Sequence, residues 1–573
     1  MKKLLLSLCC FLYLTNSNHA FCQNYDWVLT WGDASAQGLS DLKVDSLGNI
    51  YTCGYYTSTF DFDPSSAVNQ VTGGANGEFY VSKHDSLGNL IWVNGFHGPG
   101  VSSIEQMALD NNNSVTVTGY FGDSIDFDPT PLGENYISAN SYDCYVLKID
   151  TDGNVEWVHT FGSYSVDQGH NICTDGSNIY VTGRFIGNQD FDPGPGVFNL
   201  EPYPYGGQFN TFVLKLNSAG DFVWAGQYGS SWSYGMGYDP TGNILITGKF
   251  ESSFEAGIGP TVDTLFLDQH SDIFVIKIDT SGNHQWAKSY AGYSYDYGSD
   301  LIGNALGEVY VTGGFRYDAD FGTVSNPIPL TAGGLYDHFI LKLNPDGSTQ
   351  WVRHVGSDVA IGNALELDPA ENIIAVGYFE NDDTDFNPGV GDSILINGGQ
   401  KDIFYQCLNP DGDFLFAGKV GEISGESAAA VAVTKEGKIV IGGAFNGVTD
   451  FDPGTGVQQE YCQGQVDPYI LKLNASPYSI PPIIIDDSGL SSYDNNGIFV
   501  YPNPTNDQVY IKLNDYSGED VRIHLYDIQG NVLVSDNLQN NLNFSVEHLP
   551  PGIYMLEIDC NDFIETVKLS IID

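Results

Sequence analysis

The chain has few basic residues. It carries 21 Lys and Arg against 72 Asp and Glu, a formal net charge of −51 over 573 residues. Nucleic acids and anionic membranes are bound through basic patches, so this balance argues against both as partners. A surface this acidic attracts cations and suits a soluble protein exposed on or outside the cell.

Long apolar runs are missing after the first residues. Residues 1–22 have the layout of a secretory signal peptide, with two lysines, an apolar run over Leu4–Leu14, and a polar stretch with cleavage predicted after Ala20 or Cys22. This run is too short to span a bilayer, and no later run of about 18 apolar residues follows. We therefore expect Sec export to the periplasm and a mature protein that is not transmembrane.

Cysteines are few and irregularly placed. Three of the nine fall in the first 22 residues, and no C-x-x-C pair occurs. An exported protein can form disulfides, but the spacing here indicates no framework. We favour free, buried thiols for the remaining six, which are Cys53, Cys144, Cys173, Cys407, Cys462 and Cys560.

Catalytic motifs are also missing. The chain has no G-x-S-x-G, H-E-x-x-H or P-loop pattern, and its histidines fall at unrelated positions. We favour a protein that is not an enzyme, with an enzyme as the alternative.

The chain does contain a regular repeat, typified by residues 178–224. Each copy has β-like apolar runs separated by Gly, Asp and Pro turns. The glycine after one run recurs at intervals of 64 to 66 residues, a spacing that indicates a repeat architecture. These repeat glycines are Gly54, Gly119, Gly183, Gly248, Gly313, Gly377 and Gly443.

Each repeat supplies four strand candidates. The second strand carries the repeat glycine, which we expect to allow close packing of an aromatic ring or a neighbouring backbone. The fourth strand carries Trp in most repeats, with Phe416 in the sixth. Turns of the D-x-x-G-N type connect the strands and suit β-hairpins. The sequence therefore predicts an all-β fold.

The third strand carries a lysine in six of seven repeats, with Cys407 as the exception. An anion-binding ring is one interpretation; we favour pairing with an acidic residue on an adjacent strand. The lysines are Lys83, Lys148, Lys215, Lys277, Lys342 and Lys472.

The two ends of the repeat region predict a closed ring. The seventh repeat stops at Asn474 without a tryptophan strand, whereas Trp27 lies 65 residues before Trp92, in step with the repeat. The stretch Tyr25–Leu29 is therefore expected to complete the last blade. We predict a seven-bladed β-propeller over residues 24–474. These repeats resemble the secreted bacterial β-propeller repeats (SBBP-like) of exported Bacteroidetes proteins, a resemblance that implies the fold and says little about ligands.

The end of the chain differs from the repeats. Residues 475–497 are rich in Pro, Ser, Asp and Asn and are expected to be a linker. Residues 498–573 contain Y-P-N-P from Tyr501, L-Y-D-I-Q-G-N-V-L from Leu525, L-P-P-G-I-Y from Leu549 and the terminal Val567–Leu569. These motifs resemble the type A C-terminal sorting domain of the type IX secretion system. The resemblance implies a small β-sandwich, handling by that secretion machinery, and delivery to the cell surface or medium.

The most regular polar motif is D-F-D-P, expected in the loop between strands two and three. Paired carboxylates with backbone carbonyls can bind calcium. The alternative, which we favour, is that the Asp side chains accept backbone amides and Pro stiffens the turn. The candidate metal ligands are Asp61, Asp63, Asp126, Asp128, Asp190, Asp192, Asp450 and Asp452.

Aromatic residues gather in the loops of the third to fifth repeats, where they suit a sugar or protein ligand. They are Tyr203, Tyr205, Trp232, Tyr234, Tyr293, Tyr295 and Tyr297. We predict a binding or adhesion module for a glycan or an extracellular protein. The alternatives are a structural surface component, or a carbohydrate-active enzyme that uses carboxylates such as Asp167 and Asp296 at the channel mouth.

Overall fold

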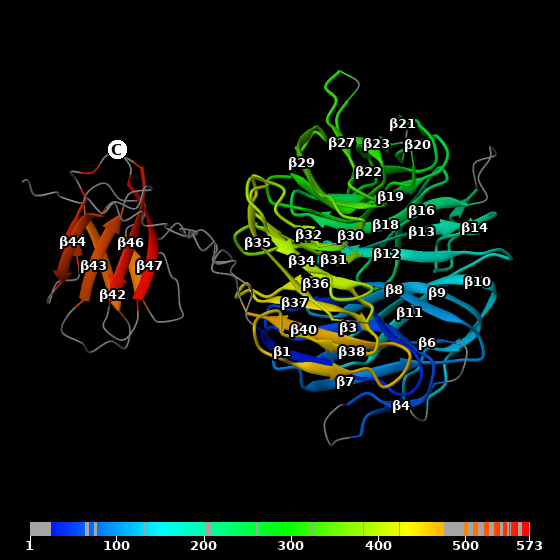
Figure 1. Ribbon diagram of the computed structural model, residues 1–573. Helices are drawn as coiled ribbons and strands as arrows, with labels where there is room; N and C mark the ends of the chain where they lie inside the picture. The colour runs from blue at the N-terminus through cyan, green and yellow to red at the C-terminus, as the bar shows by residue number, and fades with distance from the viewer. Residues whose placement is uncertain are drawn as a thin grey trace, which may run out of the picture. The chain divides into compact units, whose positions relative to one another are not determined.

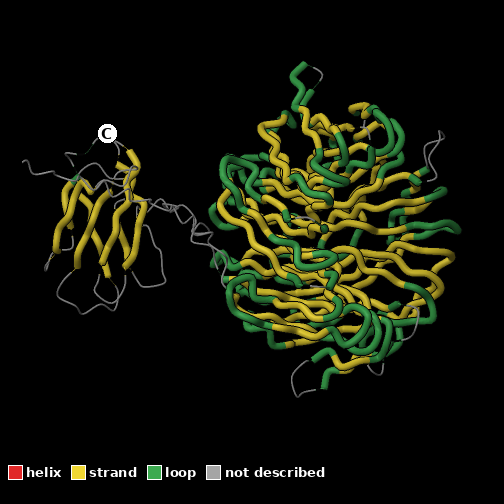
Figure 2. Tube along the Cα trace, viewed as in Figure 1, coloured by secondary structure: helices red, strands yellow, loops and turns green. Residues whose placement is uncertain are grey.

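The computed structural model describes residues 25–474, apart from 64–67, 74–76, 131–132, 202–208, 259–261, 293, 324, 382 and 423, and parts of 498–571. The predicted signal peptide and linker lie outside the described residues. The chain divides into two compact units, residues 1–479 and 480–573. All regular elements of the described residues are strands (Figure 2), and none is a helix that could cross a membrane.

The first unit is a seven-bladed β-propeller, as predicted (Figure 1). Each blade is an antiparallel sheet of four strands, because runs of alternating apolar residues are separated by tight turns. The first three blades are β2 (Gln37–Val44), β3 (Ile50–Tyr56), β6 (Glu78–His84) and β7 (Leu90–Phe96); β8 (Ser102–Leu109), β9 (Val115–Asp126), β10 (Tyr136–Ile149) and β11 (Val155–Phe161); and β12 (Gln168–Thr174), β13 (Asn178–Phe185), β16 (Asn210–Asn217) and β17 (Phe222–Tyr228).

The fourth to sixth blades repeat this order. They are β18 (Trp232–Asp239), β19 (Asn243–Phe250), β22 (Asp272–Asp279) and β23 (His284–Gly292); β24 (Tyr297–Gly303), β25 (Val309–Phe315), β28 (Asp337–Leu343) and β29 (Thr349–Val355); and β30 (Val359–Leu367), β31 (Ile373–Glu380), β34 (Asp402–Leu408) and β35 (Phe414–Val420).

The seventh blade joins the two ends of the propeller chain. Its strands are β36 (Glu426–Val433), β37 (Ile439–Phe445), β40 (Asp467–Leu473) and β1 (Tyr25–Thr30). β1 pairs antiparallel with β40, with Trp27 opposite Lys472 and Thr30 opposite Tyr469, and the two lie side by side in Figure 1. The first strands of the seven blades contact one another in a closed ring around the axis, including β2 against β36. The predicted closure by the N-terminal strand is confirmed.

The repeat glycines permit close contact between the first two strands of each blade. A Cβ at Gly54, Gly119 or Gly183 would collide with a carbonyl oxygen of the first strand, where that strand has a β-bulge. The neighbouring backbone is thus what requires glycine here.

The turns on one face hold successive blades together. The Trp92 indole N–H donates to the carbonyl oxygen of Thr151 at 3.1 Å, and Lys83 Nζ donates to the same oxygen at 3.0 Å. Thr151 lies in the turn between strands three and four of the next blade. Gly153 of that turn has a φ of 92°, and its Cβ position lies 3.0 Å from the Trp92 ring, so both backbone and space require glycine.

The same arrangement recurs around the ring. The lysine contacts to the turn between strands three and four of the next blade are Lys148 to Ser218 at 3.1 Å, Lys215 to Thr280 at 2.8 Å, Lys342 to Pro410 at 3.1 Å and Lys472 to Ser86 at 2.7 Å. Lys277 instead donates to the Gly307 carbonyl oxygen at 3.2 Å, in the turn between strands one and two of the next blade.

Carbonyl oxygens are thus the shared partners of these lysines. Lys148, Lys277 and Lys342 also pair with Asp110, Asp239 and Glu308, which lie in or beside the turn between strands one and two. An acidic partner on an adjacent strand, as predicted, is found for Lys148, which pairs with Glu156 of β11. An anion-binding ring does not fit, because the amines are already bonded within the blades and their seams.

The sixth blade is the exception, with Cys407 and Phe416 at the lysine and tryptophan positions. The next blade, the seventh, has no turn between strands three and four, because its fourth strand comes from the N-terminus. The acceptor carbonyl is therefore missing, and apolar residues replace the donors.

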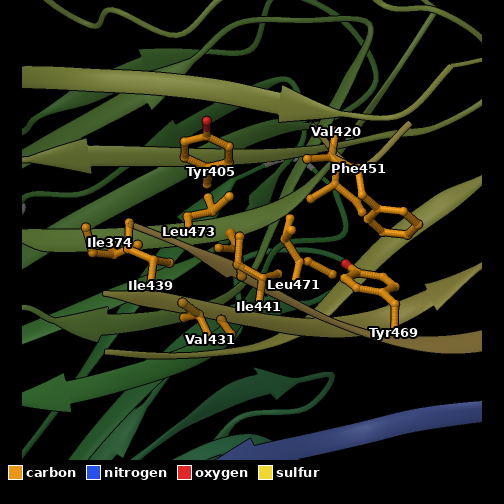
Figure 3. Close-up of a cluster of buried hydrophobic side chains, with 14 of the residues drawn as sticks. Ile374, Tyr405, Val420, Val431, Ile439, Ile441, Phe451, Tyr469, Leu471 and Leu473 are labelled. Carbon is orange, nitrogen blue, oxygen red and sulfur yellow. The ribbon is translucent and has the colours of Figure 1, made fainter. Parts of the chain in front are cut away.

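Apolar side chains fill the space between blades. Between blades six and seven, Ile374, Tyr405, Ile441, Leu471 and Phe451 pack together with exposures of 0% (Figure 3). Burial on this scale stabilises a domain by about 25 cal/mol per Å² of apolar surface. Of the six cysteines discussed above, the five that the structure describes are free thiols, and all but Cys462 are buried.

Short hairpins extend six of the blades between strands two and three. They are β4 (Phe60–Asp61) with β5 (Gln70–Val71), β14 (Gln189–Asp190) with β15 (Asn199–Leu200), β20 (Phe254–Ala256) with β21 (Asp263–Leu265), β26 (Asp318–Asp320) with β27 (Pro329–Thr331), β32 (Thr384–Asp385) with β33 (Ile394–Leu395), and β38 (Val448–Asp450) with β39 (Gln459–Tyr461).

The second unit has two sheets, consistent with the predicted small sandwich. One contains β41 (Ile498–Tyr501), β42 (Gln508–Leu513) and β45 (Asn543–Ser545); the other contains β44 (Val532–Leu538), β43 (Val521–Tyr526), β46 (Gly552–Asp559) and β47 (Ile564–Ile571). Val509, Ile523 and Leu556 are fully buried.

Candidate functional site

The D-F-D-P loops and the connections between blades lie on the same face of the propeller. His97, in the connection after the first blade, bridges to Asp126 in the D-F-D-P loop of the second. Ala291 and Gly292 at the end of β23 likewise pair with β26 of the next blade. We call this the loop face; the D-x-x-G-N turns occupy the opposite, turn face.

The first Asp of each motif accepts backbone amides. Asp190 Oδ1 accepts the amides of Asp192 at 3.1 Å and Phe198 at 2.8 Å. Asp61, Asp126 and Asp450 make the matching pair of contacts. The phenylalanine between the two acids is fully or almost fully buried, so the motif anchors the loop.

The second Asp also bonds locally. Asp128, Asp192 and Asp452 each accept an amide two residues on, and Asp63 accepts the Asn69 side chain at 2.9 Å. Among the described residues, no group of three or more His, Cys, Asp or Glu could hold a metal ion. Calcium at D-F-D-P stays a prediction.

A polar channel runs along the propeller axis. Its cavity of about 290 Å³ is lined by first-strand residues of all seven blades, including Asp41, Glu105, Asp300 and Glu366. The β-bulges place one unpaired residue per blade against the channel, such as Glu105 and Tyr234. Sequence reasoning missed these positions, because a bulge shows in the register and not in the repeat spacing.

The channel carboxylates surround one lysine. Burial raises the pKa of Glu366 to about 7 and that of Asp300 to about 6. Burial alone would lower the pKa of Lys43, but the neighbouring carboxylates, Asp41 first among them, raise it. Both oxygens of Asp300 accept backbone amides, from Leu301 at 2.8 Å and Leu365 at 3.0 Å. Asp300 therefore ties two blades together.

The acids expected at the channel mouth lie elsewhere. Asp167 and Asp296 are 1% and 0% exposed and sit in the seams between blades. Asp167 accepts the amides of Ser163 and Ile186. The prediction that Asp167 and Asp296 line the channel mouth is therefore wrong. Both lie just before a first strand, where the chain is covered by the preceding blade.

An aromatic groove opens on the loop face over blades four and five. It has a volume of about 380 Å³ and is lined by Tyr234, Tyr295, Tyr297, Tyr336 and Lys249, with Ser271 and Ser299. The Tyr297 ring lies 6.1 Å from both Tyr234 and Tyr336. Tyr234 and Tyr295 are 38% and 45% exposed. Because Tyr234 and Ser299 also line the channel, the groove is its mouth.

The predicted aromatic loop residues are only partly in this groove. Tyr234, Tyr295 and Tyr297 line it, whereas Trp232 stacks under the Arg184 guanidinium at 4.1 Å. Tyr203, Tyr205 and Tyr293 lie outside the described residues. Sequence analysis missed Tyr336, which directly precedes the third strand of blade five. It joins the other tyrosines in the groove only because the blades pack in a ring.

The end of the chain matches a protein family. Residues 499–572 match the model of the secretion system C-terminal sorting domain. An uncharacterized WD repeat-containing protein, L264, of Acanthamoeba polyphaga mimivirus is 22% identical over 503 residues. That match covers 73% of this chain and 36% of the viral protein, so the chain spans about a third of that relative's length.

Two solved structures from B. thetaiotaomicron are similar at 11% identity. The extracellular domain of the putative one component system BT4673 has a TM-score of 0.17, with 96% of this chain and 99% of that one covered. The extracellular domain of the putative hybrid two component system BT3049 has a TM-score of 0.14, with 93% and 84% covered. The likeness to SBBP-like repeats stays a resemblance. The C-terminal unit is a type IX secretion sorting domain, and the protein is secreted or displayed at the cell surface.

Proposed function

We propose that the protein is an extracellular binding or adhesion module whose aromatic groove binds a neutral glycan. The observation that carries this is the arrangement of Tyr234, Tyr295, Tyr297 and Tyr336 around one groove. Tyrosine rings offer flat apolar faces for sugar rings and a hydroxyl for hydrogen bonds. The net charge of −51 disfavours an acidic glycan.

An extracellular protein is the other ligand class that such tyrosines suit. A hydrolase is less well supported. Glu366 and Asp300 resemble a carboxylate pair of glycosidases, but both oxygens of Asp300 are taken by backbone amides.

The test is a glycan and matrix-protein array probed with the purified protein and with Tyr234→Ala and Tyr295→Ala. Binding to neutral glycans that falls at least about tenfold in both variants supports the proposal; tenfold corresponds to about 1.4 kcal/mol. Binding confined to matrix proteins would replace the glycan with a protein ligand. If the protein binds nothing on the array, or if the variants bind like wild type, the groove is not the binding site.

Delivery through the type IX machinery has its own test. Removing residues 498–573 should leave the propeller in the periplasm, as followed by cell fractionation. Removing only the predicted linker residues 475–497 serves as the control and should preserve export. Normal surface delivery without the sorting domain would refute its role.

A further inference from the structure

Each seam between blades contains one recurring pair of buried positions on the loop face. A residue near the loop-face end of the third strand of one blade lies beside a residue at or just before the start of the first strand of the next. Between blades four and five these are Asp272, the first residue of β22, and Asp296, which directly precedes β24. Ser271 and Tyr295 form a parallel bridge, and the Asp296 amide donates to the Ser271 carbonyl at 3.1 Å. The two aspartates therefore follow paired residues and lie side by side.

Both aspartates have an oxygen without a hydrogen-bond partner. Each residue is 0% exposed. Asp272 Oδ2 accepts the Asp268 amide at 2.8 Å and Asp296 Oδ1 accepts the Arg316 amide at 2.8 Å. Asp272 Oδ1 and Asp296 Oδ2 are buried and unpartnered. A buried carboxylate without a counter-charge is costly, and two neighbouring ones are costlier.

In two other seams the equivalent aspartate has a basic side chain as its partner. Between blades six and seven, Lys419 Nζ binds the equivalent Asp402 at 2.7 Å. Between blades five and six, His354 Nδ1 lies 2.9 Å from the equivalent Asp337. Lys419 and His354 occupy the same position of the fourth strand, since each is paired with the phenylalanine two residues after a strand-three aspartate.

Blade four has a serine at this position. Ser289 pairs with Phe274 in the same register, and no described Lys, Arg or His forms an ion pair with Asp272 or Asp296. Blade two has Thr160 opposite Tyr145, and its seam holds Asp143 and Asp167. Asp143 Oδ1 is unpartnered there, whereas each oxygen of Asp167 accepts one backbone amide. Two seams therefore combine two acids with no cation from the protein.

One further oxygen lies beside Asp296 in the seam between blades four and five. The Cβ position of Gly292 lies 2.6 Å from Asp296 Oδ2 and also in close contact with the Asp318 carbonyl oxygen, so the two oxygens are near one another and a larger residue than glycine would collide with both. Hard cations such as calcium take carboxylate and carbonyl oxygens of this kind.

We propose that the seam between blades four and five binds a divalent cation of the calcium class through Asp272 and Asp296, and that Asp143 and Asp167 form a second copy between blades two and three. The first ion lies behind the aromatic groove, because Ser271 and Tyr295 line that groove and are bridged next to the two ligands. The ion braces the connection that carries Tyr295 and Tyr297.

The two carboxyls could instead share a proton. Burial raises the pKa of Asp272 to about 6 and that of Asp296 to about 7, with each acid's acidic neighbour adding to the effect. Four charged or titratable residues lie next to the pair. The amides of Asp268 and Arg316 bond the two carboxylates, the His270 ring stacks on Tyr295, and the Asp318 carbonyl lies beside Gly292. A shared proton predicts stability that calcium does not change.

The test uses calcium titration calorimetry and melting of the purified protein, in calcium and in chelator. Wild type should bind about two ions and melt higher in calcium. Asp272→Asn and Asp143→Asn should each remove one ion, and the double variant both. Because each substitution removes a like charge, the variants should melt in chelator no lower than wild type.

A second variant supplies the missing charge. Ser289→Lys copies the pairing of Lys419 with Asp402, so it should raise the melting temperature in chelator and remove one calcium ion. Asp192→Asn is the matched control in a D-F-D-P loop and should keep both ions. Loss of ions in Asp192→Asn with full binding in Asp272→Asn would overturn the proposal in favour of the D-F-D-P loops. An absence of calcium binding to wild type would overturn it in favour of the shared proton. Calcium binding and melting temperature do not depend on the ligand of the groove, so a failure of glycan binding would not affect this test.

Discussion

The two faces of the propeller use the same repeat differently. On the turn face, nearly every blade places a lysine and a tryptophan on the next blade's turn, and the contacts vary little. On the loop face, equivalent positions change from blade to blade: the residue after the repeat glycine is Tyr120, Arg184, Lys249 or Gly314.

This difference separates scaffold from function. A contact that every blade needs is kept wherever its acceptor exists, and it is lost in blade six where the acceptor turn is missing. Positions that face the groove or a seam make no contact that every blade needs, so their residue types differ from blade to blade. The comparison predicts that turn-face changes affect folding and loop-face changes affect binding.

The largest effect is expected from deleting Tyr25–Thr30. The seventh blade would lose its outer strand, and β40 would expose an unpaired edge that promotes aggregation. A chain that starts at Tyr25 is the control. Circular dichroism melting should show a large loss of stability for the deletion alone. Equal melting of the two chains would contradict closure by β1.

A smaller but still large effect is expected for Lys277→Met on the turn face. It leaves Asp239, which is 0% exposed and bonded to Lys277 at 2.7 Å, without its counter-charge. Removing one partner of a buried pair costs about 3–5 kcal/mol. Lys215→Met is the matched control, since its amine donates to a carbonyl oxygen and lies over the Tyr180 ring but forms no ion pair among the described residues, and it should cost about 1 kcal/mol. Urea unfolding of both variants measures the difference. Equal losses would mean that the ion pair adds nothing.

A pH-dependent effect should come from the seam on the loop face. The folded pKa values of Asp272 and Asp296 are raised above the ordinary value near 4. Their contribution to stability is therefore present at low pH and is lost as the pH rises from about 4 to about 7. In chelator, wild type should lose stability over this range relative to Asp296→Asn. If the melting temperatures of wild type and Asp296→Asn change with pH in the same way, the raised pKa values are contradicted.

The smallest effect on stability is expected for Tyr234→Ala and Tyr295→Ala, whose rings are partly exposed. Surface substitutions of this kind usually change stability by less than about 0.5 kcal/mol. Melting curves should match wild type. A large loss would show that the groove is part of the scaffold.

Much of the scaffold could be predicted from sequence, because the repeat exposes it directly. The 65-residue step from Trp27 to Trp92 predicted ring closure, and the repeat glycines predicted close backbone contact. The carbonyl partners of the lysines could not be predicted, since Thr151 and its counterparts lie on the next blade. The acid at the start of strand three was visible as a repeat, but its neighbour Asp296 becomes apparent only when two blades pack together.

The groove was predicted in part for the same reason. Tyr234, Tyr295 and Tyr297 stood out by composition, whereas Tyr336 comes from a different segment of the ring. The favoured interpretation of D-F-D-P, that its Asp side chains accept backbone amides, agrees with the two amides that Asp190 accepts from its own loop, and calcium at this motif stays a prediction.

The most direct test of the account compares ligand binding by one variant from each face. Array binding is measured for Tyr295→Ala and Lys215→Met at a temperature where melting curves show both to be folded. We expect Tyr295→Ala to lose glycan binding, and Lys215→Met, though less stable, to bind like wild type. Retained binding by Tyr295→Ala with loss in Lys215→Met would place the ligand on the turn face and contradict the account.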